Sequence, residues 1–476
     1  MTEIIARVSA LHMLTRSETV DEPLGLTSVT RSFVADSITP IAAYLALVQP
    51  GRSCLLESVE GTERISRFSF IGLDYLDSQA VDRDPAMLER IRTIVGKYRL
   101  DRSDLPFPGG AVCTFTYDAA RALEPVLHRA QAEAPPADVR FGDALIVVPG
   151  TWIVFDHFTH RMTLIGFARD ESERAGVDAR LDAYVARLLD QRATIPGAIR
   201  ADGPIEASMD EATFLARVAQ AQEYIRDGEA YQLQVGIRFS CLIAGTAFDF
   251  YRHIRARNPS PYMFYIEADG RAVFGASPEF LVRLDGRTAR IRPLAGTRPR
   301  GVDDAADHRI AQELLADPKE RAEHVMLVDL ARNDLGAVCR TGTVRVDELM
   351  VIERYSHVMH IVSNVVGELR EGYDALDLFA ASFPAGTVTG APKIRAMQLI
   401  DELEPVARGP YAGSVAHIDF DGDMDSCIIL RSVAVANGRA FWQASAGIVT
   451  DSVPAAEYAE VFAKTAIVRA VLGIAP

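Results

Sequence analysis

The stretch AVFGASPEFLVRLDGRTARIRPLAGTRPRG (272–301) decides the fold class, because it holds two apolar, β-branched runs separated by a short turn signal. We predict strands over 272–286 and 288–301, joined at Asp285-Gly286, a dipeptide typical of tight hairpins. The second strand carries Gly296-Thr297 among arginines, and a glycine lets backbone N–H groups approach a ligand closely. This segment therefore predicts antiparallel strands and a loop suited to an anion.

Further elements lie on both sides of this hairpin. Strands are expected over 110–120, 144–157 and 230–243, and helices over 211–227, over about 304–335, from Pro392 onward and from about Pro454 onward. Strands occur in hairpins as well as between helices, which favours an α+β fold over a parallel βαβ sheet. Residues 195–210 lose the apolar periodicity, so we expect a region of 1–200 and a second of 205–476.

Composition excludes several classes of protein. The 476 residues are 49% hydrophobic and carry a net charge of −15, which argues against a nucleic-acid surface. The five cysteines are scattered without CxxC spacing, as is usual in a reducing compartment. No uncharged apolar run approaches the ~20 residues of a membrane span, and no cleavage signal follows the N-terminus. We expect a cytoplasmic protein that binds neither membranes nor nucleic acid.

Two helical segments each offer carboxylates at helical spacing. Glu320 and Glu323 lie three residues apart in one, and Glu457, Glu460 and Lys464 repeat the pattern in the last helix. If the helices face each other, these oxygens suit Mg²⁺, which keeps its waters and substrate oxygens. The alternative is a solvated helix face with an ordinary Glu460–Lys464 pair.

Three other features suit an anion or a proton transfer. Gly386 and Gly390 bracket two threonines before a helix whose N-terminus could bind an anion, although a plain turn is the alternative. Arg431 lies in CIILRSVAV (427–435), an otherwise apolar strand, so we expect it to meet a carboxylate of the protein or of a ligand. His357 and His360 lie in a β-like run and matter only if one of them lines the same cleft.

Together these segments resemble the chorismate-utilising enzymes, and most closely component I, the large subunit, of anthranilate synthases. The resemblance covers nearly the whole chain, in the family's order. It is carried by LLESVEGTERISRFSFIG (55–72), SPEFL (277–281), RPLAGTRPRG (292–301), KERAEHVMLVDLARNDLG (319–336), RYSHVMHIVSNVVGEL (354–369), FPAGTVTGAPKIRAMQLIDELE (383–404), RGPYAGSVAHID (408–419) and AEYAEVFAKT (456–465).

The resemblance implies a fold, a substrate and a set of site residues. The fold would be two intertwined subdomains with large, mostly antiparallel sheets and helices around a central active-site cleft. Chorismate, a dianion, would be bound by the family positions Gly296, Thr297, Tyr411, Arg431, Gly447 and Lys464. The catalytic residues would be His360, Glu279 and Thr387, and Mg²⁺ would be held by Glu323 and Glu460, with Glu320 and Glu457 beside them.

The same resemblance separates the possible reactions. Relatives that make aminodeoxychorismate carry a lysine nucleophile where this chain has Ala295, and relatives that add water carry a lysine base where it has Gln232. Direct attack by ammonia remains, and His360 implies that pyruvate is then eliminated to give anthranilate. The alternatives are an aminodeoxyisochorismate synthase, an aminodeoxychorismate synthase and a silent tryptophan-sensing subunit. One departure is Ser445, where the family usually has glycine; its side chain is expected to crowd the site.

Regulation and partners also follow from the resemblance. The family's feedback site for L-tryptophan maps onto two segments and one further position: Glu57, Ser58, Asn258, Pro259, Ser260, Tyr262, Met263 and Cys427. No cysteine has the surroundings of a glutaminase nucleophile, so ammonia is expected from a separate glutamine amidotransferase subunit (component II) in a hetero-oligomer. The implied role is the first committed step of tryptophan biosynthesis.

Overall fold

The hairpin expected at Asp285-Gly286 forms: Asp285 pairs with Thr288, and Gly286 has a φ of 58° in the turn between them. Each of the two expected strands is divided in two, giving β12 (Arg271–Ser277), β13 (Phe280–Asp285), β14 (Thr288–Ile291) and β15 (Leu294–Pro299). The divisions fall at Pro278 and Pro293, which have no N–H to give to a ladder. At Pro278 the chain moves from β21 to β20 as a partner, whereas β14 and β15 both pair with β17 on the two sides of Pro293.

The computed structural model describes residues 23–49, 51–58, 67–100, 107–130, 141–192, 194–355 and 358–474. Between these residues every strand pairing is antiparallel except that of β1 with β4. The remaining strands are β1 (Leu24–Val34), β2 (Arg52–Glu57), β3 (Phe68–Val81), β4 (Tyr98–Leu100), β5 (Ala111–Phe115), β6 (Ala144–Asp156), β7 (Arg161–Ala168), β8 (Arg200–Ala201), β9 (Glu206–Ala207), β10 (Gln232–Ala244), β11 (Tyr262–Ala268), β16 (Arg345–Arg354), β17 (Val358–Glu368), β18 (Gly390–Ala391), β19 (Ser414–Ile418), β20 (Met424–Ile428), β21 (Ser432–Ala436) and β22 (Arg439–Ile448).

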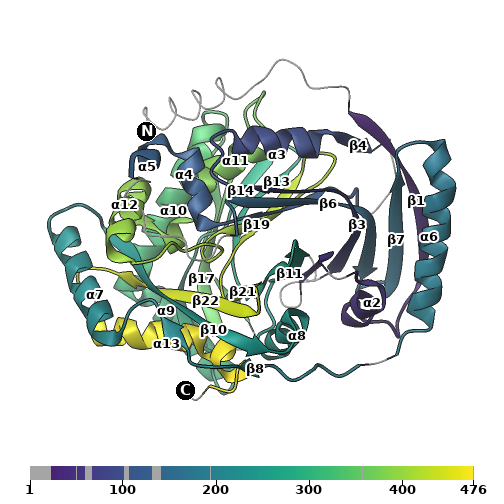
Figure 1. Ribbon diagram of the computed structural model, residues 1–476. Coiled ribbons are helices and arrows are strands. Elements are labelled where there is room, and N and C mark those ends of the chain that lie inside the picture. The colour runs from purple at the N-terminus through teal and green to yellow at the C-terminus, as the bar shows by residue number, and fades with distance from the viewer. Residues whose placement is uncertain are drawn as a thin grey trace.

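Helices cover both ends of this sheet system. They are α2 (Pro40–Leu47), α3 (Met87–Gly96), α4 (Ala120–Leu123), α5 (Pro125–Ala130), α6 (Glu171–Leu189), α7 (Glu211–Arg226), α8 (Ala247–Arg257), α9 (Asp304–Ala316), α10 (Pro318–Val338), α11 (Ala375–Ser382), α12 (Lys393–Leu403) and α13 (Pro454–Val471), with short turns η1 (Tyr117–Ala119) and η2 (Gly386–Val388). Helix α6 flanks β1 and β7 at one end, while α7, α12 and α13 lie at the other (Figure 1).

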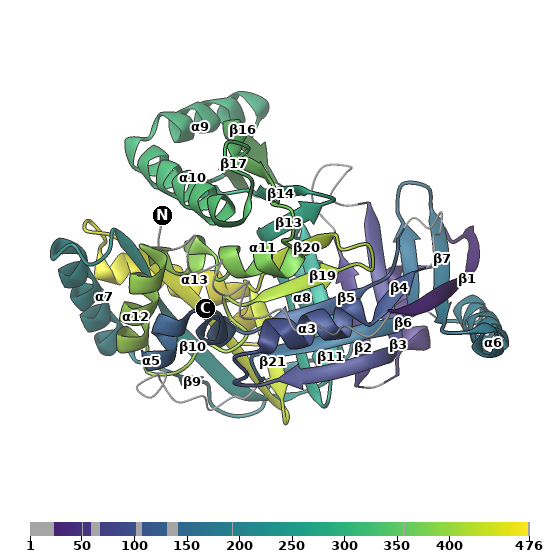
Figure 2. The ribbon, with the colours of Figure 1, turned by 90° about the horizontal axis from the view of Figure 1, so that it is seen from above.

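The sheet system branches at β6, which pairs with β7 toward β1 and β4 and with the first strands of two longer arms. One arm runs through β3, β2, β11, β12, β21 and β22 to β10. The other runs through β5, β19, β20, β13 and β14 to β17, which also pairs with β15 and β16. Seen from above, β16 and β17 with α9 and α10 form a layer of their own (Figure 2). The candidate site residues lie at the ends of both arms.

The expected intertwining of two halves is confirmed by strand pairing across them. From the first half, β2 pairs with β11 and β5 pairs with β19, so both arms contain strands from before and after residue 200. The boundary near 200–205 stays a prediction; the short strands β8 and β9 lie there and pair with β10. Among the described residues, no helix is long and apolar enough to cross a membrane.

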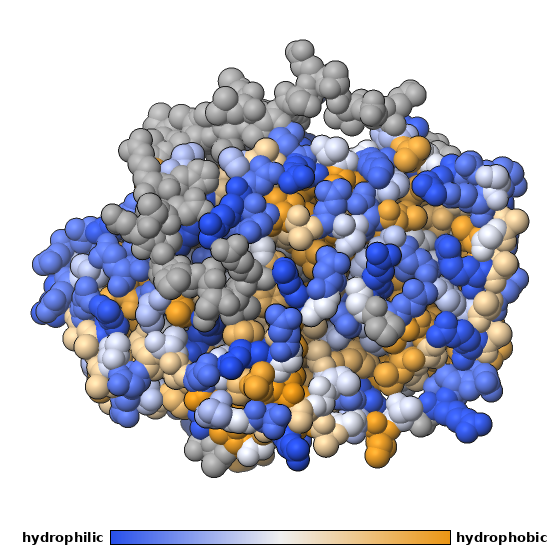
Figure 3. All heavy atoms as spheres, viewed as in Figure 1, coloured by the Kyte–Doolittle hydropathy of each residue, from blue (hydrophilic) through white to orange (hydrophobic). Residues whose placement is uncertain are grey.

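Apolar burial holds the arms together. Two large clusters, one around Trp152 and Phe115 and one around Tyr265 and Phe274, draw residues from both halves of the chain. Fully burying one such side chain contributes about 1.5–3 kcal/mol. The face shown in Figure 3 is mostly polar, with apolar side chains scattered singly or in small groups.

Two expected elements were wrong in detail. The helical run over 304–335 is two helices, because Asp317 ends α9 and caps α10, and Pro318 occupies the first turn of α10. The segment CIILRSVAV is not one strand: β20 ends at Ile428 and β21 begins at Ser432. Arg431 lies in the break with a φ of 46°. This conformation is uncommon for a residue with a Cβ.

Candidate active site

Gly296 forms a β-bulge that sets Thr297 opposite His360. In the pairing of β15 with β17, Ala295 lies opposite Ile361 and Thr297 opposite His360, which leaves Gly296 as the extra residue. Gly296 has a φ of 69°, and a Cβ there would lie 3.0 Å from Glu320 Oε2. The bulge in the Ala-Gly-Thr sequence thus changes the direction of the Thr297 side chain, as a glycine bulge commonly does.

The contacts of His360 determine which of its nitrogens carries hydrogen. Nδ1 lies 3.0 Å from Thr297 Oγ1 and 3.2 Å from the carbonyl oxygen of Gly296. A carbonyl oxygen can only accept, so Nδ1 donates and Nε2 keeps a lone pair. Burial lowers the pKa of His360, and the nearby Arg431 cation lowers it further, although the bond to Gly296 acts in the opposite direction. The ring is therefore a neutral base at Nε2. His357 lies outside the described residues.

Glu279 is a carboxyl group that stays protonated near neutral pH. It follows Pro278, where the chain leaves β12 for β13, and its Oε1 accepts from Thr387 Oγ1 at 3.2 Å. The surrounding protein raises the pKa of Glu279 to about 8, against the smaller, opposite effect of the Thr387 hydroxyl. Glu279 and Thr387 line one small cavity beside α10. A carboxyl group in this state can donate a proton.

Thr387 lies in η2, which fits closely under α10. A Cβ on Gly386 would lie 1.9 Å from Leu330 Cδ2, so a larger residue there would require the Leu330 side chain to move. The turn ends before α12, whose N-cap residue, Pro392, makes no side-chain hydrogen bond to the helix. The turn therefore serves to place the Thr387 hydroxyl against Glu279 and not to cap α12.

Arg431 has no ion pair or side-chain hydrogen bond within the described part of the chain. Of the two partners expected, a carboxylate of the protein or one of a ligand, the described residues do not supply the first. The side chain is exposed to solvent in this structure, while the surrounding protein lowers its pKa and its charge lowers the pKa of His360. It is available to a carboxylate of a ligand.

The four glutamates of α10 and α13 lie close enough to influence one another. Burial raises the pKa of Glu323, and the charges of Glu320 and Glu460 raise it further, while a bond from Gln232 lowers it. Burial also raises the pKa of Glu457, with Glu460 adding to the effect. Glu320 accepts from Arg298 at 2.9 Å. Glu460 and Lys464 form the exposed i,i+4 pair that the alternative expected, while the effect of Glu460 on Glu323 shows that its charge reaches α10.

This arrangement fits a divalent cation held by few protein ligands. No preformed cluster of three or more His, Cys, Asp or Glu ligands occurs among the described residues. Mg²⁺ commonly takes one or two carboxylates and completes its shell with water and substrate oxygens. Glu323 and Glu460 fit that role, because a bound cation would relieve the repulsion between them. Arg298 already engages Glu320.

Lys464 joins α13 to β22 beside Gly447. Its Nζ lies 2.7 Å from Glu460 Oε1 and donates to the carbonyl of Ser445 at 2.8 Å. Gly447 lies opposite Gln234 in the pairing of β10 with β22, and a Cβ there would lie 2.8 Å from Gln232 Nε2. Glycine at this position leaves space on the strand surface beside the Lys464 cation. A bound carboxylate would need that space.

Ser445 does not simply crowd the site, as the sequence suggested. Its hydroxyl lies 2.7 Å from Tyr411 OH and donates to Gln234 Oε1 at 2.8 Å, and the residue is 2% exposed. The side chain is therefore part of a buried network that includes Tyr411, an expected substrate contact.

Three polar residues of this region were missed by the sequence analysis. Gln234 donates from Nε2 to the Thr387 carbonyl at 3.0 Å. The buried pair Arg408–Glu404 also braces the site, since Arg408 donates to the Val388 carbonyl at 2.6 Å. In the sequence, the only sign of the Arg408–Glu404 pair was two opposite charges, four residues apart, at the end of an apolar helix.

A separate cavity of about 370 Å³ lies between β2, β11, β13 and β20. Of the residues expected at the tryptophan site it is lined by Glu57, Ser58, Tyr262, Met263 and Cys427. Asn258, Pro259 and Ser260 are not among its lining residues; they form the turn that leads from α8 to β11.

The walls of this cavity are aromatic on one side and acidic on the other. The ring of Phe107 lies 4.5 Å from that of Phe70 and 4.9 Å from that of His417, centroid to centroid. Burial lowers the pKa of His417 to about 4, so this ring is neutral. Acidic lining residues outnumber the one lining arginine, Arg283; they are Glu57, Asp285, Asp419, Asp423 and Asp425. Such a cavity suits an aromatic ligand with a cationic amine.

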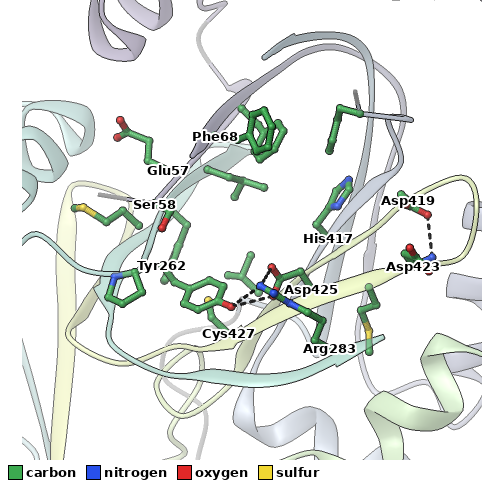
Figure 4. A pocket seen from close by; sticks show the side chains of 18 of the residues that line it. Glu57, Ser58, Phe68, Tyr262, Arg283, His417, Asp419, Asp423, Asp425 and Cys427 are labelled. Carbon is green, nitrogen blue, oxygen red and sulfur yellow. Dashed lines mark hydrogen bonds and ion pairs between the residues drawn. The ribbon is translucent and has the colours of Figure 1, made fainter. Parts of the chain in front are cut away.

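The polar lining residues differ in whether other protein groups already occupy their hydrogen-bonding atoms (Figure 4). The Glu57 carboxylate turns away from the cavity, where it accepts from Arg255 at 2.8 Å and from Tyr251 at 2.6 Å. Asp425 binds Arg283 at 2.5 Å and Tyr262 at 3.1 Å. The Ser58 hydroxyl is buried, and no partner for it occurs among the described residues. Ser58 therefore brings to the cavity wall a hydroxyl that no described residue engages.

Fold and site together define an α+β enzyme whose candidate site joins a neutral histidine, a protonated carboxyl group and an unpaired arginine. The chain belongs to the chorismate binding enzyme family, whose model matches residues 57–470.

Comparisons with known proteins narrow this further. The chain is 43% identical to anthranilate synthase component 1 of Streptomyces coelicolor over 91% of this chain and 86% of the relative. It is 43% identical to anthranilate synthase component 1 of Thermus thermophilus over 93% and 97% of the two chains. The crystal structure of anthranilate synthase component I from Streptococcus pneumoniae superposes with a TM-score of 0.76 at 32% identity, covering 92% of this chain and 98% of that one.

Proposed function

We propose that this chain is the aminase subunit of an anthranilate synthase, which converts chorismate and ammonia to anthranilate, pyruvate and water. The proposal rests on the hydrogen-bonded pair of His360 and Thr297. Beside this pair lies Arg431, which has no ion-pair partner among the described residues. Together they combine a base with an anion site, while Ala295 and Gln232 offer neither an amine nucleophile nor a base.

The site residues would act at different steps of the reaction. Arg431 and Lys464 would bind the carboxylates of chorismate, and the backbone at Gly447 leaves room for one of them. When ammonia adds at C2 of the ring, Glu279 would give its proton to the departing C4 hydroxyl. His360 Nε2 would then take the proton from C2 as pyruvate leaves and the ring becomes aromatic. This last step separates an anthranilate synthase from an aminodeoxyisochorismate synthase.

Mg²⁺ held by Glu323 and Glu460 would act as a Lewis acid toward a carboxylate of the substrate. Support for this assignment comes from the charge of Glu460 on α13, which raises the pKa of Glu323 on α10. Lys464 at Glu460 and Arg298 at Glu320 would keep the neighbouring carboxylates oriented.

We further propose that L-tryptophan occupies the 370 Å³ cavity and inhibits the enzyme, and that a glutamine amidotransferase subunit supplies the ammonia. The aromatic and acidic walls of the cavity support the first point. Strands β13 and β20 connect the cavity with Glu279, because the N–H of Ile428 donates to the Glu279 carbonyl at 3.1 Å. The relatives' designation as component 1 supports the second.

One assay tests the function directly. The purified chain is mixed with chorismate, Mg²⁺ and ammonium at mildly alkaline pH, and products are followed by anthranilate fluorescence and mass spectrometry. Anthranilate formation that ceases with EDTA is the expected result. Accumulated aminodeoxyisochorismate would instead assign the truncated reaction, and no turnover of chorismate would refute the aminase role. A parallel assay with L-tryptophan tests the feedback site.

A further inference from the structure

His360 is the middle residue of a row that crosses three strands on one face of the sheet. In the pairing of β15 with β17 it lies opposite Thr297, and in the pairing of β16 with β17 it lies opposite Glu353. Residues directly opposite each other in antiparallel strands project from the same face and are within reach of one another. Thr297 engages Nδ1 from one side, so Glu353 is the neighbour of His360 on the other.

Two groups hold the carboxylate of Glu353 in place. Arg292 donates from Nη2 to Oε1, and the Tyr355 hydroxyl donates to Oε2 at 2.9 Å. The backbone of Tyr355 is fixed in turn, because its N–H donates to the Val358 carbonyl at 2.8 Å and its carbonyl accepts from Arg300 at 2.7 Å. The negative charge of Glu353 therefore has a defined position.

Tyr355 also connects this carboxylate with the base. Its ring meets that of His360 edge to face, with the ring centroids 5.7 Å apart. His360 is 6% exposed, so water and salt screen little of the effect of nearby charges on its ring. Within the described residues, the charge of Arg431 disfavours the protonated ring, while the charge of Glu353 and the bond to the Gly296 carbonyl favour it.

We propose that Glu353 is a positioning residue for the elimination of pyruvate, whose fixed negative charge favours the uptake of a proton by His360 Nε2. In that step the proton of C2 moves to Nε2, the electrons of the C–H bond enter the ring, and the ring–oxygen bond breaks with its electron pair on the pyruvate oxygen. The imidazole becomes a cation, and its proton then neutralises the enolate of pyruvate. Arg431 opposes this charge, and Glu353 offsets that effect from the neighbouring strand.

The inference rests on the proposed function, because it takes His360 as the base, but the pKa of His360 tests it without turnover. The histidine-labelled chain is titrated by NMR, and the His360 signal is identified by its loss in His360→Gln. Glu353→Gln keeps an oxygen for the Tyr355 hydroxyl but removes the charge, so the pKa of His360 should fall by about 0.5 to 1 pH unit. Glu353→Asp keeps the charge and should restore most of the wild-type value.

Glu348→Gln is the matched control. Glu348 lies on the same strand and accepts from the same arginine, Arg292, at 3.1 Å, but it lies opposite Asn364 and not opposite His360. Its replacement should leave the pKa of His360 unchanged. An unchanged pKa in Glu353→Gln, or equal falls in the two glutamine variants, would overturn the proposal.

Two further measurements cover a variant that does not fold and a pKa that lies too low. If thermal unfolding shows that Glu353→Gln is unfolded, Arg292→Gln replaces it. Loss of this counter-ion leaves the charge of Glu353 uncompensated and should raise the pKa of His360, and no change would refute the inference. If the wild-type chain unfolds above the pKa of His360, Glu353 and its glutamine variant are compared in the Arg431→Gln background, where that pKa is higher; equal values there also refute it.

Activity gives a readout that a merely structural role would not move. At constant free NH₃, the acidic limb of pyruvate release should move to lower pH in Glu353→Gln, because His360 then stays neutral to lower pH. A loss of rate at every pH without movement of this limb would contradict the proposal. A wild-type chain that releases no pyruvate from chorismate would refute the proposed function, while the NMR titration would still decide on Glu353.

Discussion

Thr297 and His360 meet across the pairing of β15 with β17, with Oγ1 and Nδ1 3.0 Å apart. The bulge at Gly296 creates this contact and also brings its own carbonyl to the same nitrogen. Because Nδ1 must donate, the opposite nitrogen of the ring is left as the base. The bulge at Gly296 in β15 thus determines which nitrogen of His360, on β17, can accept a proton.

His360→Gln should stop the elimination of pyruvate while leaving the addition of ammonia. The glutamine side chain can keep a hydrogen bond to Thr297 but cannot accept the ring proton. We expect anthranilate formation to fall by about 10²-fold or more and aminodeoxyisochorismate to accumulate, as identified by mass spectrometry. The exposed His308, changed to glutamine, is the control. Full anthranilate formation by the His360 variant would exclude the histidine as the base.

Arg431→Gln should change both substrate affinity and the pH profile. Loss of a charged partner for a carboxylate should raise KM for chorismate about 10- to 150-fold. The Arg431 cation lowers the pKa of His360, so its removal raises that pKa. The rate of pyruvate release falls as His360 becomes protonated, and this acidic limb should therefore move to higher pH in the variant. An unchanged acidic limb would show that another group controls it.

Thr387→Val should move the alkaline limb of the profile in the same direction. Glu279 must be protonated to act as an acid, and its pKa is raised to about 8, so activity should fall as pH rises through that value. The Thr387 hydroxyl lowers this pKa, and its removal should raise it further. Rates are compared at a constant concentration of free NH₃, with a loss at the optimum of about 2- to 12-fold. A shift to lower pH would contradict the assignment.

Local sequence patterns predicted much of this fold and little of the geometry of the site. The hairpin at Asp285-Gly286 and helix α7 follow from turn chemistry and apolar spacing, and both form as expected. The break at Arg431 was not predictable, because an apolar run gives no sign of where a strand changes partner. The bond between Ser445 and Tyr411 joins residues 34 positions apart and depends on which strands become neighbours.

The family motifs assigned roles to residues for which the chemistry alone left alternatives open. Spacing of Glu320 and Glu323 was equally compatible with a solvated helix face, and only the packing of α10 near α13 distinguishes the two. Gln234 lies outside the family motifs, and Glu404 ends one of them without an assigned role, since a polar residue in a strand or helix end is usually solvated.

Glu323→Gln and Glu460→Gln should each abolish magnesium-linked stabilisation. At a Mg²⁺ concentration of 100 times Kd, binding should add about 2.7 kcal/mol to the free energy of unfolding of the wild-type chain. Thermal unfolding with and without Mg²⁺ measures this difference. Asp329→Asn, on the exposed side of α10, should keep it. Equal magnesium effects in all four proteins would place the cation elsewhere.

Ser58→Ala should weaken inhibition by L-tryptophan without lowering activity in its absence. The Ser58 hydroxyl is buried in the wall of the 370 Å³ cavity without a partner among the described residues, so it is free to bond a ligand. Loss of one such bond should raise the inhibition constant about 2- to 12-fold. Ser69→Ala, whose hydroxyl bonds His157 at 2.7 Å on neighbouring β3, is the matched control and should leave inhibition unchanged. If both variants keep the wild-type inhibition constant, Ser58 does not contact tryptophan. If both lose inhibition equally, the effect reflects the stability of β2 and β3 and not a contact in the cavity.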